Sequence, residues 1–567
     1  MTEPMIVFND FSFQYDSQAE PTLKNLNLTI NEGEKVLIVG PSGSGKSTFA
    51  HCINGLIPNQ YHGEIHGEAW IAGKKLQETS LFDLSFVTGT VLQDTDGQFI
   101  GLTVAEDMAF ALENDGVAQA EMHQRVAQWA QTVDVAEQTE KRPQDLSGGQ
   151  KQRVSMAGVM INDAPILLFD EPLANLDPAA GKDAIGLIDR IHQQTKATVL
   201  IIEHRLEDAL AKPVDRIIVF QEGQIIADAT PDQLLASSTL AESGIREPLY
   251  VTALKYAGVN LATVEHLSAL EQVSTPNLKE QLAAWQQPLN EPIKKAQEPL
   301  FELKDLSYRY RKQDDFVLNR LSTTFYRGEK VSIVGKNGAG KSTLFKALCG
   351  FVRPEGEMRW ENRDVRQESI KERADKIGYV MQNPNQMISQ KMIFDEVALG
   401  LRLRGVSEEV VAERVYQVLK VCGLYPFRKW PIAALSYGQK KRVTIAAILV
   451  LEPEMIVLDE PTAGQDFHNY TEMMRFIDEL NQLGKTIVMI THDMHLMLEY
   501  SDRALVISEG QVLADTHPID VLTNQQLVAE ASLKETSLFT LANQVGLADP
   551  VVFTRQFIQY DREVRHV

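Results

Sequence analysis

The chain lacks most features that mark membrane-embedded or secreted proteins. No apolar run approaches the roughly 18 residues that a membrane-spanning helix needs. The first residues, MTEPMIVFNDFSF, contain no basic stretch followed by an apolar block, so we expect no secretory signal. The three cysteines form no CxxC pair. Together these absences predict a chain that works in a reducing, intracellular compartment.

Basic charge is also scarce. The formal net charge is −22 at pH 7, from 55 Lys and Arg against 77 Asp and Glu. Because nucleic-acid binding needs a basic surface, we expect no nucleic-acid partner. The composition is otherwise that of a globular protein, with 44% hydrophobic and 23% charged residues. The 567 residues are too many for one hydrophobic core, so several domains are expected.

What the chain does contain is a long internal repeat. VLIVGPSGSGKSTF at residues 36–49 corresponds to VSIVGKNGAGKSTL at residues 331–344, 295 positions later. LLFDEP at 167–172 corresponds to IVLDEP at 456–461, and LSGGQ at 146–150 to LSYGQ at 435–439, both 289 positions later. Periods of this length are far too long for a solenoid and indicate a duplicated domain.

Each copy has the pattern of an α/β domain. Short apolar runs such as KVLIV, ILLF and TVLII predict buried parallel strands. Stretches rich in Ala, Glu and Gln, such as 119–135, predict helices between them. Helical insertions are expected near 100–145 and 390–434. We predict domains at 4–238 and 299–525, a proline-containing linker at 239–298 and a C-terminal extension at 526–567.

Two glycine-rich loops carry the strongest chemical signal. GPSGSGKS (40–47) and GKNGAGKS (335–342) fit G-x-x-x-x-G-K-[ST], and each follows a predicted strand and opens a predicted helix. Such loops point backbone N–H groups at phosphate oxygens, with the helix N-terminus adding its positive dipole end. Lys46 and Lys341 would reach the β- and γ-phosphates, and Ser47 and Ser342 would hold Mg²⁺. The expected nucleotide-binding residues are Gly40, Pro41, Ser42, Gly43, Ser44, Gly45, Lys46, Ser47 and Thr48, and Gly335, Lys336, Asn337, Gly338, Ala339, Gly340, Lys341, Ser342 and Thr343.

Two acidic pairs follow apolar runs. Asp170 and Asp459 each end such a run, where a carboxylate would lie beside the phosphate loop and bind the metal through water. The next residues, Glu171 and Glu460, are then placed to orient and polarise the attacking water. General-base help of this kind is worth about 10²–10⁴-fold in rate. A solvated turn is the alternative interpretation, and the flanking apolar runs and prolines argue against it.

Polar residues follow further predicted strands at positions that repeat in both copies. His204 and His492 come after buried-strand patterns, within reach of a γ-phosphate if the strands are neighbours. Gln93 and Gln382 also follow short strands, TVLQ and YVMQ, and are candidates for sensing the metal or the attacking water.

In order, and twice over, these motifs resemble the nucleotide-binding domains of ATP-binding-cassette (ABC) proteins. The resemblance covers about four fifths of the chain. It implies two tandem P-loop NTPase domains, each with a RecA-like α/β core, an antiparallel β subdomain and a helical subdomain. It implies ATP and Mg²⁺ as ligands, and it assigns Tyr15 and Tyr310 to adenine stacking. Asp177 and Asp466, in ANLD and AGQD, match the family's D-loop at the domain contact.

The resemblance also explains the duplicated pentapeptide, because two such domains face each other head to tail. Lys46 would then share an ATP with Ser436, Gly438 and Gln439, and Lys341 with Ser147, Gly149 and Gln150. Ser-x-x-Gln is a capping-box pattern, so each pentapeptide should open a helix whose N-terminus addresses a phosphate. Tyr437 replaces Gly148 in the first helical turn, where we expect its side chain to point away. Since each copy keeps its Lys, Asp, Glu and His, we hypothesise that both sites hydrolyse ATP.

Two kinds of ABC protein without membrane segments remain, an importer ATPase and a ribosome-associated translation factor of the ABC-F type. The short, nearly neutral linker and the acidic charge favour the importer. Residues 93–114 and 382–401 resemble the Gln segment and following helix of energy-coupling-factor (ECF) ATPases, which drive uptake of vitamins, their precursors or transition-metal ions. The resemblance implies an integral transmembrane coupling (T) protein and a substrate-capture (S) protein as partners, and a peripheral position on the cytoplasmic face of the cell membrane.

Two further clusters invite interpretation. The pairs Glu106/Asp107 and Asp395/Glu396 lie 289 positions apart, and we hypothesise that they line grooves for coupling helices of the membrane partner, which carry Arg in the family. A solvated helix face is the alternative. His51, Cys52, His62 and His66 fall close together, but no second Cys pair follows, so a zinc site is the weaker interpretation.

Overall fold

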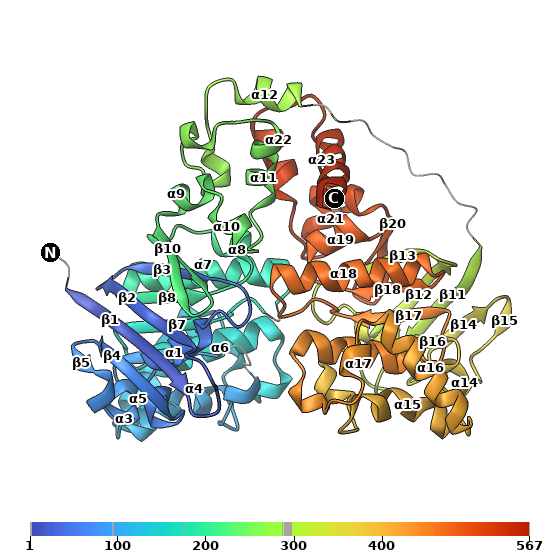
Figure 1. Cartoon of the computed structure of the whole chain (residues 1–567), viewed down its shortest axis with the longest axis horizontal. Helices are drawn as coiled ribbons and strands as arrows, with labels where there is room; N and C mark the ends of the chain where they lie inside the picture. Colours follow the sequence, from blue (N-terminus) through green and yellow to red (C-terminus); the bar gives the residue numbers. More distant parts are fainter. Residues whose placement is uncertain (1–2, 93–95, 175, 286, 288–297, 566–567) are drawn as a thin grey trace. The chain divides into compact units, whose positions relative to one another are not determined.

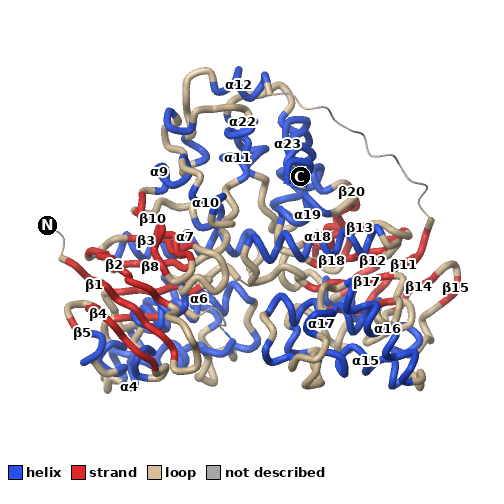
Figure 2. Tube along the Cα trace, in the orientation of Figure 1, coloured by secondary structure: helices blue, strands red, loops and turns tan. Residues whose placement is uncertain are grey.

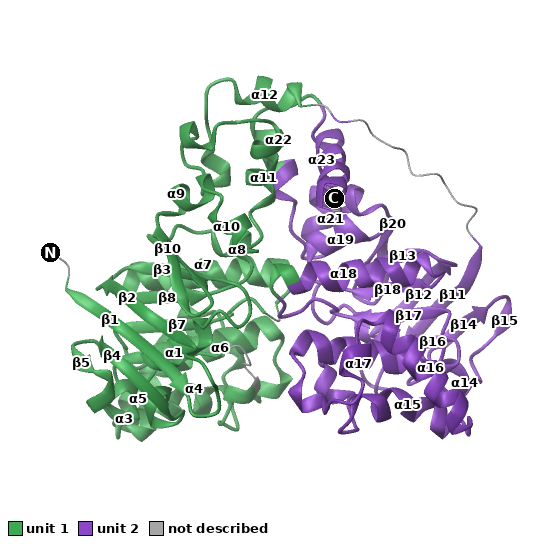
Figure 3. Cartoon of the chain, viewed as in Figure 1, with its two compact units in different colours: residues 1–285, 466–468, 540–548 green, residues 286–465, 469–539, 549–567 purple. Residues whose placement is uncertain are grey.

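The computed structural model describes residues 3–92, 96–174, 176–285, 287 and 298–565. It divides into two compact units. Unit 1 comprises residues 1–285, 466–468 and 540–548, and unit 2 comprises 286–465, 469–539 and 549–567 (Figure 3). Each unit contains one copy of the repeat.

Unit 1 is built on two sheets (Figure 1). The four-stranded sheet has the order β2-β1-β4-β5 and is antiparallel, and the six-stranded sheet has the order β10-β9-β3-β8-β7-β6. In the larger sheet β9, β3, β8, β7 and β6 run parallel, and β10 is an antiparallel edge strand. The strands are β1 (Pro4–Tyr15), β2 (Leu23–Asn31), β3 (Lys35–Val39), β4 (Gly63–Ile71), β5 (Lys74–Lys75), β6 (Thr88–Val91), β7 (Ile166–Asp170), β8 (Thr198–Ile202), β9 (Arg216–Gln221) and β10 (Gln224–Ala229).

The predicted strands form because their apolar side chains are buried on both faces of the sheet. All five residues of KVLIV in β3 and of TVLII in β8 are buried, as expected for parallel strands covered by helices. The helices are α1 (Lys46–Ile53), α2 (Leu56–Asn59), α3 (Leu81–Ser85), α4 (Val104–Asn114), α5 (Gln119–Thr132), α6 (Gly148–Met160), α7 (Pro178–Thr195), α8 (Leu206–Ala209), α9 (Pro231–Ala236), α10 (Thr239–Glu242), α11 (Leu249–Tyr256) and α12 (Leu278–Ala284). The predicted helical insertion is confirmed by α4 and α5, and α4 packs on α6.

Unit 2 repeats this architecture. Its sheets have the orders β12-β11-β14-β15 and β16-β17-β18-β13-β19-β20, with strands β11 (Pro299–Tyr308), β12 (Leu318–Tyr326), β13 (Lys330–Val334), β14 (Glu355–Trp360), β15 (Arg363–Asp364), β16 (Ile377–Val380), β17 (Met455–Asp459), β18 (Thr486–Ile490), β19 (Arg503–Ser508) and β20 (Gln511–Thr516). Its helices are α13 (Lys341–Leu348), α14 (Ile370–Ala374), α15 (Ile393–Leu403), α16 (Glu408–Val421), α17 (Tyr437–Leu449), α18 (Phe467–Gln482), α19 (Met494–Tyr500), α20 (Pro518–Leu522), α21 (Gln525–Glu530) and α23 (Pro550–Arg565), of which the first two residues of α18 belong to unit 1. Helix α22 (Ser537–Gln544) lies mostly in unit 1, which includes residues 540–548.

In each unit one hydrophobic core joins the two sheets, and the two cores are equivalent. The unit 1 core combines Phe8, Phe11 and Phe13 of β1 with Phe49 of α1 and Phe220 of β9, all fully buried. The unit 2 core likewise combines side chains from its two sheets and its phosphate-loop helix. The predicted fold class, two tandem α/β domains with antiparallel β and helical additions, is therefore confirmed. Figure 2 shows the strands of each unit in red, with helices in blue around them.

The segments outside the repeat also contain secondary structure. Residues 239–285 carry α10, α11 and α12 and belong to unit 1, while the chain end carries α21, α22 and α23. The buried Tyr250 of α11 donates its hydroxyl to Leu267 O over 2.7 Å. The boundaries proposed at 238/239, 298/299 and 525/526 stay predictions. Among the described residues, no helix combines the length and apolarity needed to cross a membrane.

Candidate active sites

The first glycine-rich loop joins β3 to α1, as predicted. Lys46 begins α1, and its Nζ donates to Gly40 O over 2.7 Å and to Pro41 O over 2.9 Å. Burial lowers the pKa of the Lys46 ammonium to about 8. A Cβ on Gly40 would lie 2.3 Å from Phe220 O, so only glycine fits where the loop leaves the sheet.

The second loop repeats this geometry between β13 and α13. Lys341 Nζ donates to Gly335 O over 2.7 Å and to Lys336 O over 2.9 Å. A Cβ on Gly335 would lie 2.0 Å from Ile507 O. Both lysines are thus buried beside their loops, with the ammonium directed at loop carbonyls.

The two tyrosines assigned to adenine contact their own phosphate-loop helices in the same way. Tyr15 Oη lies 3.2 Å from Thr48 Oγ1, and Tyr310 Oη lies 3.2 Å from Thr343 Oγ1. Tyr310 remains 52% exposed. Each aromatic side chain is therefore held beside the glycine-rich loop with a partly open surface.

The acidic pair of unit 1 lies where two neighbouring parallel strands end. Asp170 is the last residue of β7 and pairs in register with Ile202 of β8. Glu171 follows in a left-handed conformation (φ 50°) and donates its N–H to Ile202 O over 2.9 Å. His204 Nε2 lies 3.0 Å from Glu171 Oε1. Burial, with a contribution from Glu171, raises the pKa of Asp170 to about 6.

Unit 2 has the same arrangement with a looser His–Glu pair. Glu460 follows β17 at φ 45° and donates its N–H to Ile490 O over 3.0 Å, while His492 Nε2 lies 3.7 Å from Glu460 Oε1. Burial raises the pKa of Glu460 to about 8. Tyr379 donates its hydroxyl to Asp459 Oδ2 over 3.0 Å. The two sites thus share their layout and differ in the surroundings of the glutamate.

Of the two predicted glutamines, only one can be placed. Gln93 lies outside the described residues. Gln382 follows β16, and its backbone carbonyl accepts from Lys441 Nζ over 2.7 Å and from Tyr437 Oη over 3.3 Å. Both donors belong to α17, the helix that the second pentapeptide opens.

The capping-box prediction for both pentapeptides is confirmed. Ser147 accepts from the N–H of Gln150, whose side chain returns to the N–H of Ser147, and α6 begins there. Ser436 and Gln439 do the same at α17. The Tyr437 hydroxyl donates to Gln382 O over 3.3 Å, and the expectation that this side chain points away from a phosphate stays a prediction. The pairing of each pentapeptide with the other copy's lysine stays a prediction.

The predicted D-loop aspartates lie at helix starts. Asp177 caps α7 by accepting from Ala180 N over 2.9 Å. Asp466 belongs to unit 1, where its Oδ2 accepts from the N–H of Ser42 in the glycine-rich loop over 2.7 Å. A residue of the second repeat therefore contacts the first phosphate loop within this unit.

The acidic pairs of α4 and α15 have partners in their own loops. Asp107 accepts from the N–H groups of Ile100 and Gly101, and the equivalent Glu396 accepts from Ser389 and Gln390. Of the first acids, Glu106 completes the capping box of α4 and Asp395 pairs with Arg402. These contacts give the acids a local role in shaping the segments before α4 and α15, and their role in docking stays a hypothesis.

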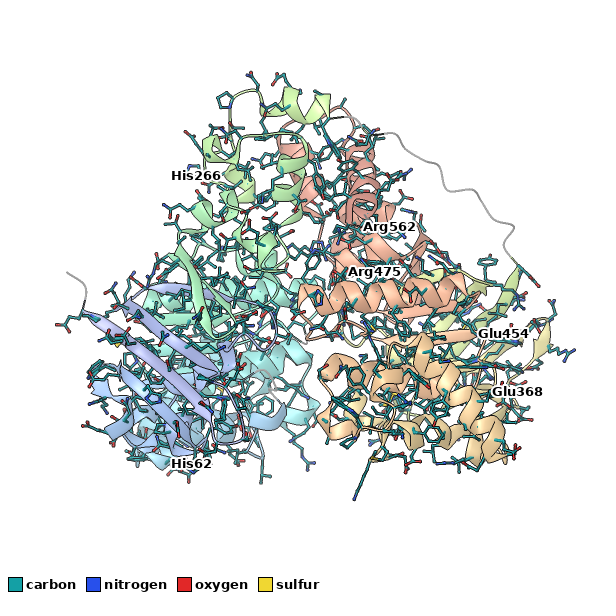
Figure 4. All side chains as sticks on the ribbon, in the orientation of Figure 1. His62, His266, Glu368, Glu454, Arg475 and Arg562 are labelled. Atoms are coloured by element: carbon teal, nitrogen blue, oxygen red, sulfur yellow. The ribbon has the colours of Figure 1, made fainter. Side chains whose placement is uncertain are left out.

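The His/Cys cluster near α1 is spread between core and surface. Cys52 is fully buried in the hydrophobic core, and the ring of His51 stacks on Tyr61 with 4.8 Å between centroids. His62, labelled in Figure 4, and His66 are exposed. Nothing in this arrangement favours the zinc interpretation.

Two buried polar residues near the sites were missed from the motifs alone. Lys441 is 1% exposed and donates to the backbone of Gln382 and Glu460, where the first copy has Gln152 donating to Pro172 O. Glu203 is 2% exposed and directly precedes His204, where the second copy has Thr491. Comparing the two copies position by position reveals both differences. Only the structure shows that the two side chains are buried beside the sites.

Comparison with known families gives this geometry a name. A model described as "ABC transporter" matches residues 23–174 and 318–463. The chain belongs to the ABC transporter family. A second model, described as "ATP-binding cassette cobalt transporter", matches residues 237–308. As a member of this family, the chain is an ATP-binding protein and an ATPase with a duplicated ABC domain.

Similar proteins extend over the full length of this ABC ATPase. An ABC transporter ATP-binding protein of Enterococcus faecalis is 65% identical over 100% of both chains. One of Lactobacillus johnsonii is 56% identical over 99% of both chains, and one of Streptococcus mutans 58% over 98% of both. Among solved structures, cbiO1 of Clostridium perfringens, titled as part of the ABC transporter complex cbiONQ, is 32% identical over 41% of this chain and 94% of that chain, with a TM-score of 0.38.

Proposed function

We propose that this ABC ATPase is the energy-coupling subunit of an ECF-type importer that takes up a vitamin, its precursor or a transition-metal ion. The observation that carries the proposal is the match of residues 237–308 to a family described as a cobalt transporter. The matched segment lies mostly outside the repeated ATPase cores, so it discriminates among ABC proteins where the motifs do not. Its description favours a transition-metal ion as the cargo.

The proposed binding of ATP uses the two glycine-rich loops. Phosphate oxygens would replace the loop carbonyls as acceptors for Lys46 and Lys341, with loop N–H groups completing the cradle. Hydroxyl and carboxylate oxygens are the ligands that Mg²⁺ prefers, so the donor set fits this ion. The residues proposed to hold it are Ser47, Gln93 and Asp170 in one site, and Ser342, Gln382 and Asp459 in the other. When bound, Mg²⁺ would neutralise charge on the β- and γ-phosphates.

The proposed hydrolysis depends on the residues at the strand ends. Glu171 and Glu460 would orient the attacking water and accept its proton. His204 and His492 would position the neighbouring glutamate relative to the γ-phosphate. A base whose pKa lies near the working pH is effective in this role, and burial raises the pKa of Glu460 to about 8. Both sites keep the His–Glu pair, at 3.0 and 3.7 Å, which supports hydrolysis at both.

The proposed partners are an integral membrane coupling protein and a capture protein that binds the cargo. Two exposed apolar side chains support a docking surface, since Ile100 is 64% and Leu102 79% exposed in the segment that precedes α4. ATP-driven closure of the two ABC domains would be transmitted to the membrane partner through this segment. The family matches do not favour the ribosome-associated alternative.

Purification of the tagged chain from its native cells in mild detergent tests this proposal. We expect a small set of very hydrophobic membrane proteins, identified by mass spectrometry, to accompany the chain. Replacing Ile100 and Leu102 by Ser should reduce their recovery while the ATPase chain remains folded. Recovery of ribosomal proteins in place of membrane proteins would show the importer assignment to be wrong.

A further inference from the structure

The start of α17 holds the backbone of Gln382 with two side chains. Tyr437 and Lys441 are four positions apart and therefore lie on one face of the helix. Tyr437 Oη donates to Gln382 O over 3.3 Å, and Lys441 Nζ donates to the same oxygen over 2.7 Å. The carbonyl that follows β16 is thus tied to the pentapeptide helix at two points.

Lys441 also contacts the segment that follows β17, which contains the proposed catalytic Glu460. Its Nζ donates to Glu460 O over 3.1 Å, while the side chain is 1% exposed. A buried ammonium is retained only where acceptors satisfy it, and here backbone carbonyls of two motifs do so. One side chain therefore connects the pentapeptide helix, the Gln segment and the Asp-Glu segment of unit 2.

The first copy has different residues at both positions. Gly148 has no side chain that could supply a hydroxyl, and Gln152, which is 4% exposed, donates to Pro172 O. The replacement of Gly by Tyr in the second pentapeptide thus accompanies the replacement of Gln by Lys one turn later. In the second copy both side chains donate to one acceptor, Gln382 O.

We propose that Tyr437 and Lys441 are positioning residues for ATP hydrolysis at the C-terminal site, because they fix Gln382 and Glu460 relative to the pentapeptide helix. This inference rests on the proposed roles of Gln382 and Glu460. A displacement of α17 would move Gln382 and Glu460 together. The position of the second pentapeptide would therefore set the geometry around the attacking water in the site that contains Lys341. The residues touch no reacting atom and act through the backbone that they hold.

Turnover in a chain with one silenced site tests the proposal. In a Glu171→Gln background, we expect Tyr437→Phe to lower kcat about two- to fivefold and Lys441→Met about tenfold or more, with the KM for ATP unchanged within about twofold. Lys441→Gln, which retains a donating NH2 group on a shorter side chain, should fall between wild type and Lys441→Met. The Tyr437→Phe/Lys441→Met double variant should lose less than the product of the single effects, since both donors share one acceptor.

Lys440→Met is the matched control, because it removes an ammonium from the same helix without touching Gln382. Hydrogen exchange of residues 381–392 in the otherwise unchanged chain gives a second readout, which should rise in Tyr437→Phe and Lys441→Met but not in Lys440→Met. Equal behaviour of all three variants in both assays would overturn the proposal. A Glu171→Gln/Glu460→Gln chain that still hydrolyses ATP would instead refute the proposed role of the glutamates, and the exchange result would remain a separate test of the positioning contacts.

Discussion

Glu203 provides a quantitative test of how this fold accommodates a buried acid beside an active site. It follows β8 and is 2% exposed, and its N–H donates to Ile38 O over 3.2 Å. Burial raises its pKa from the ordinary 4.5 to about 8. The charge of Arg205 lowers this pKa, and the charge of Glu171 raises it further. Its nearest cationic contact is loose, with Arg205 Nε 3.7 Å from Glu203 Oε1.

The raised pKa makes stability depend on pH in a defined direction. Between pH 4.5 and 8 the folded chain keeps a proton on Glu203 that the unfolded chain releases, so the free energy of unfolding falls as pH rises. The slope approaches about 1.4 kcal/mol per pH unit, and the loss between pH 5 and pH 8 amounts to about 3–4 kcal/mol. Glu203→Gln removes this term, because the amide does not titrate.

Thermal unfolding at several pH values is the assay. We expect the Tm of Glu203→Gln to exceed that of the wild type by an amount that grows by about 5 °C from pH 5 to pH 8. Thr491→Ser, at the equivalent position of the second copy, is the control and should shift Tm by the same amount at every pH. A Glu203→Gln shift that does not change with pH would refute the assignment of a buried, protonated carboxyl.

Two further predictions concern the sites themselves. Glu171→Gln and Glu460→Gln should each leave partial ATP turnover and together abolish it, measured as phosphate release, and a single variant with wild-type turnover would mark its site as silent. Gly335→Ala would place a Cβ 2.0 Å from Ile507 O and should weaken binding of a fluorescent ATP analogue about tenfold or more. Gly338→Ala adds a Cβ that meets no atom within 4 Å but strains the backbone at φ 81°, so it should weaken binding less than Gly335→Ala. An equal or larger effect of Gly338→Ala would contradict the steric reasoning.

The sequence by itself determined the features that depend on local pattern. The two glycine-rich loops, the acids at the ends of β7 and β17, and the helices opened by Ser147 and Ser436 follow from residue spacing and strand hydrophobicity. These features are local because a strand end, a tight turn or a helix cap is specified within a few neighbouring residues. The duplication was read from the 289-residue and 295-residue offsets, because comparing the two halves of a sequence needs no tertiary structure.

Only the tertiary structure decided what the non-local contacts do. Tyr437 lies 55 positions from Gln382 in sequence, so its contact with that carbonyl could not be read from the pentapeptide. The acids at 107 and 396, hypothesised to face a partner, satisfy backbone N–H groups of their own loops. Glu396 is 6% exposed, and an acid removed from water in this way must take the donors that the fold places within reach.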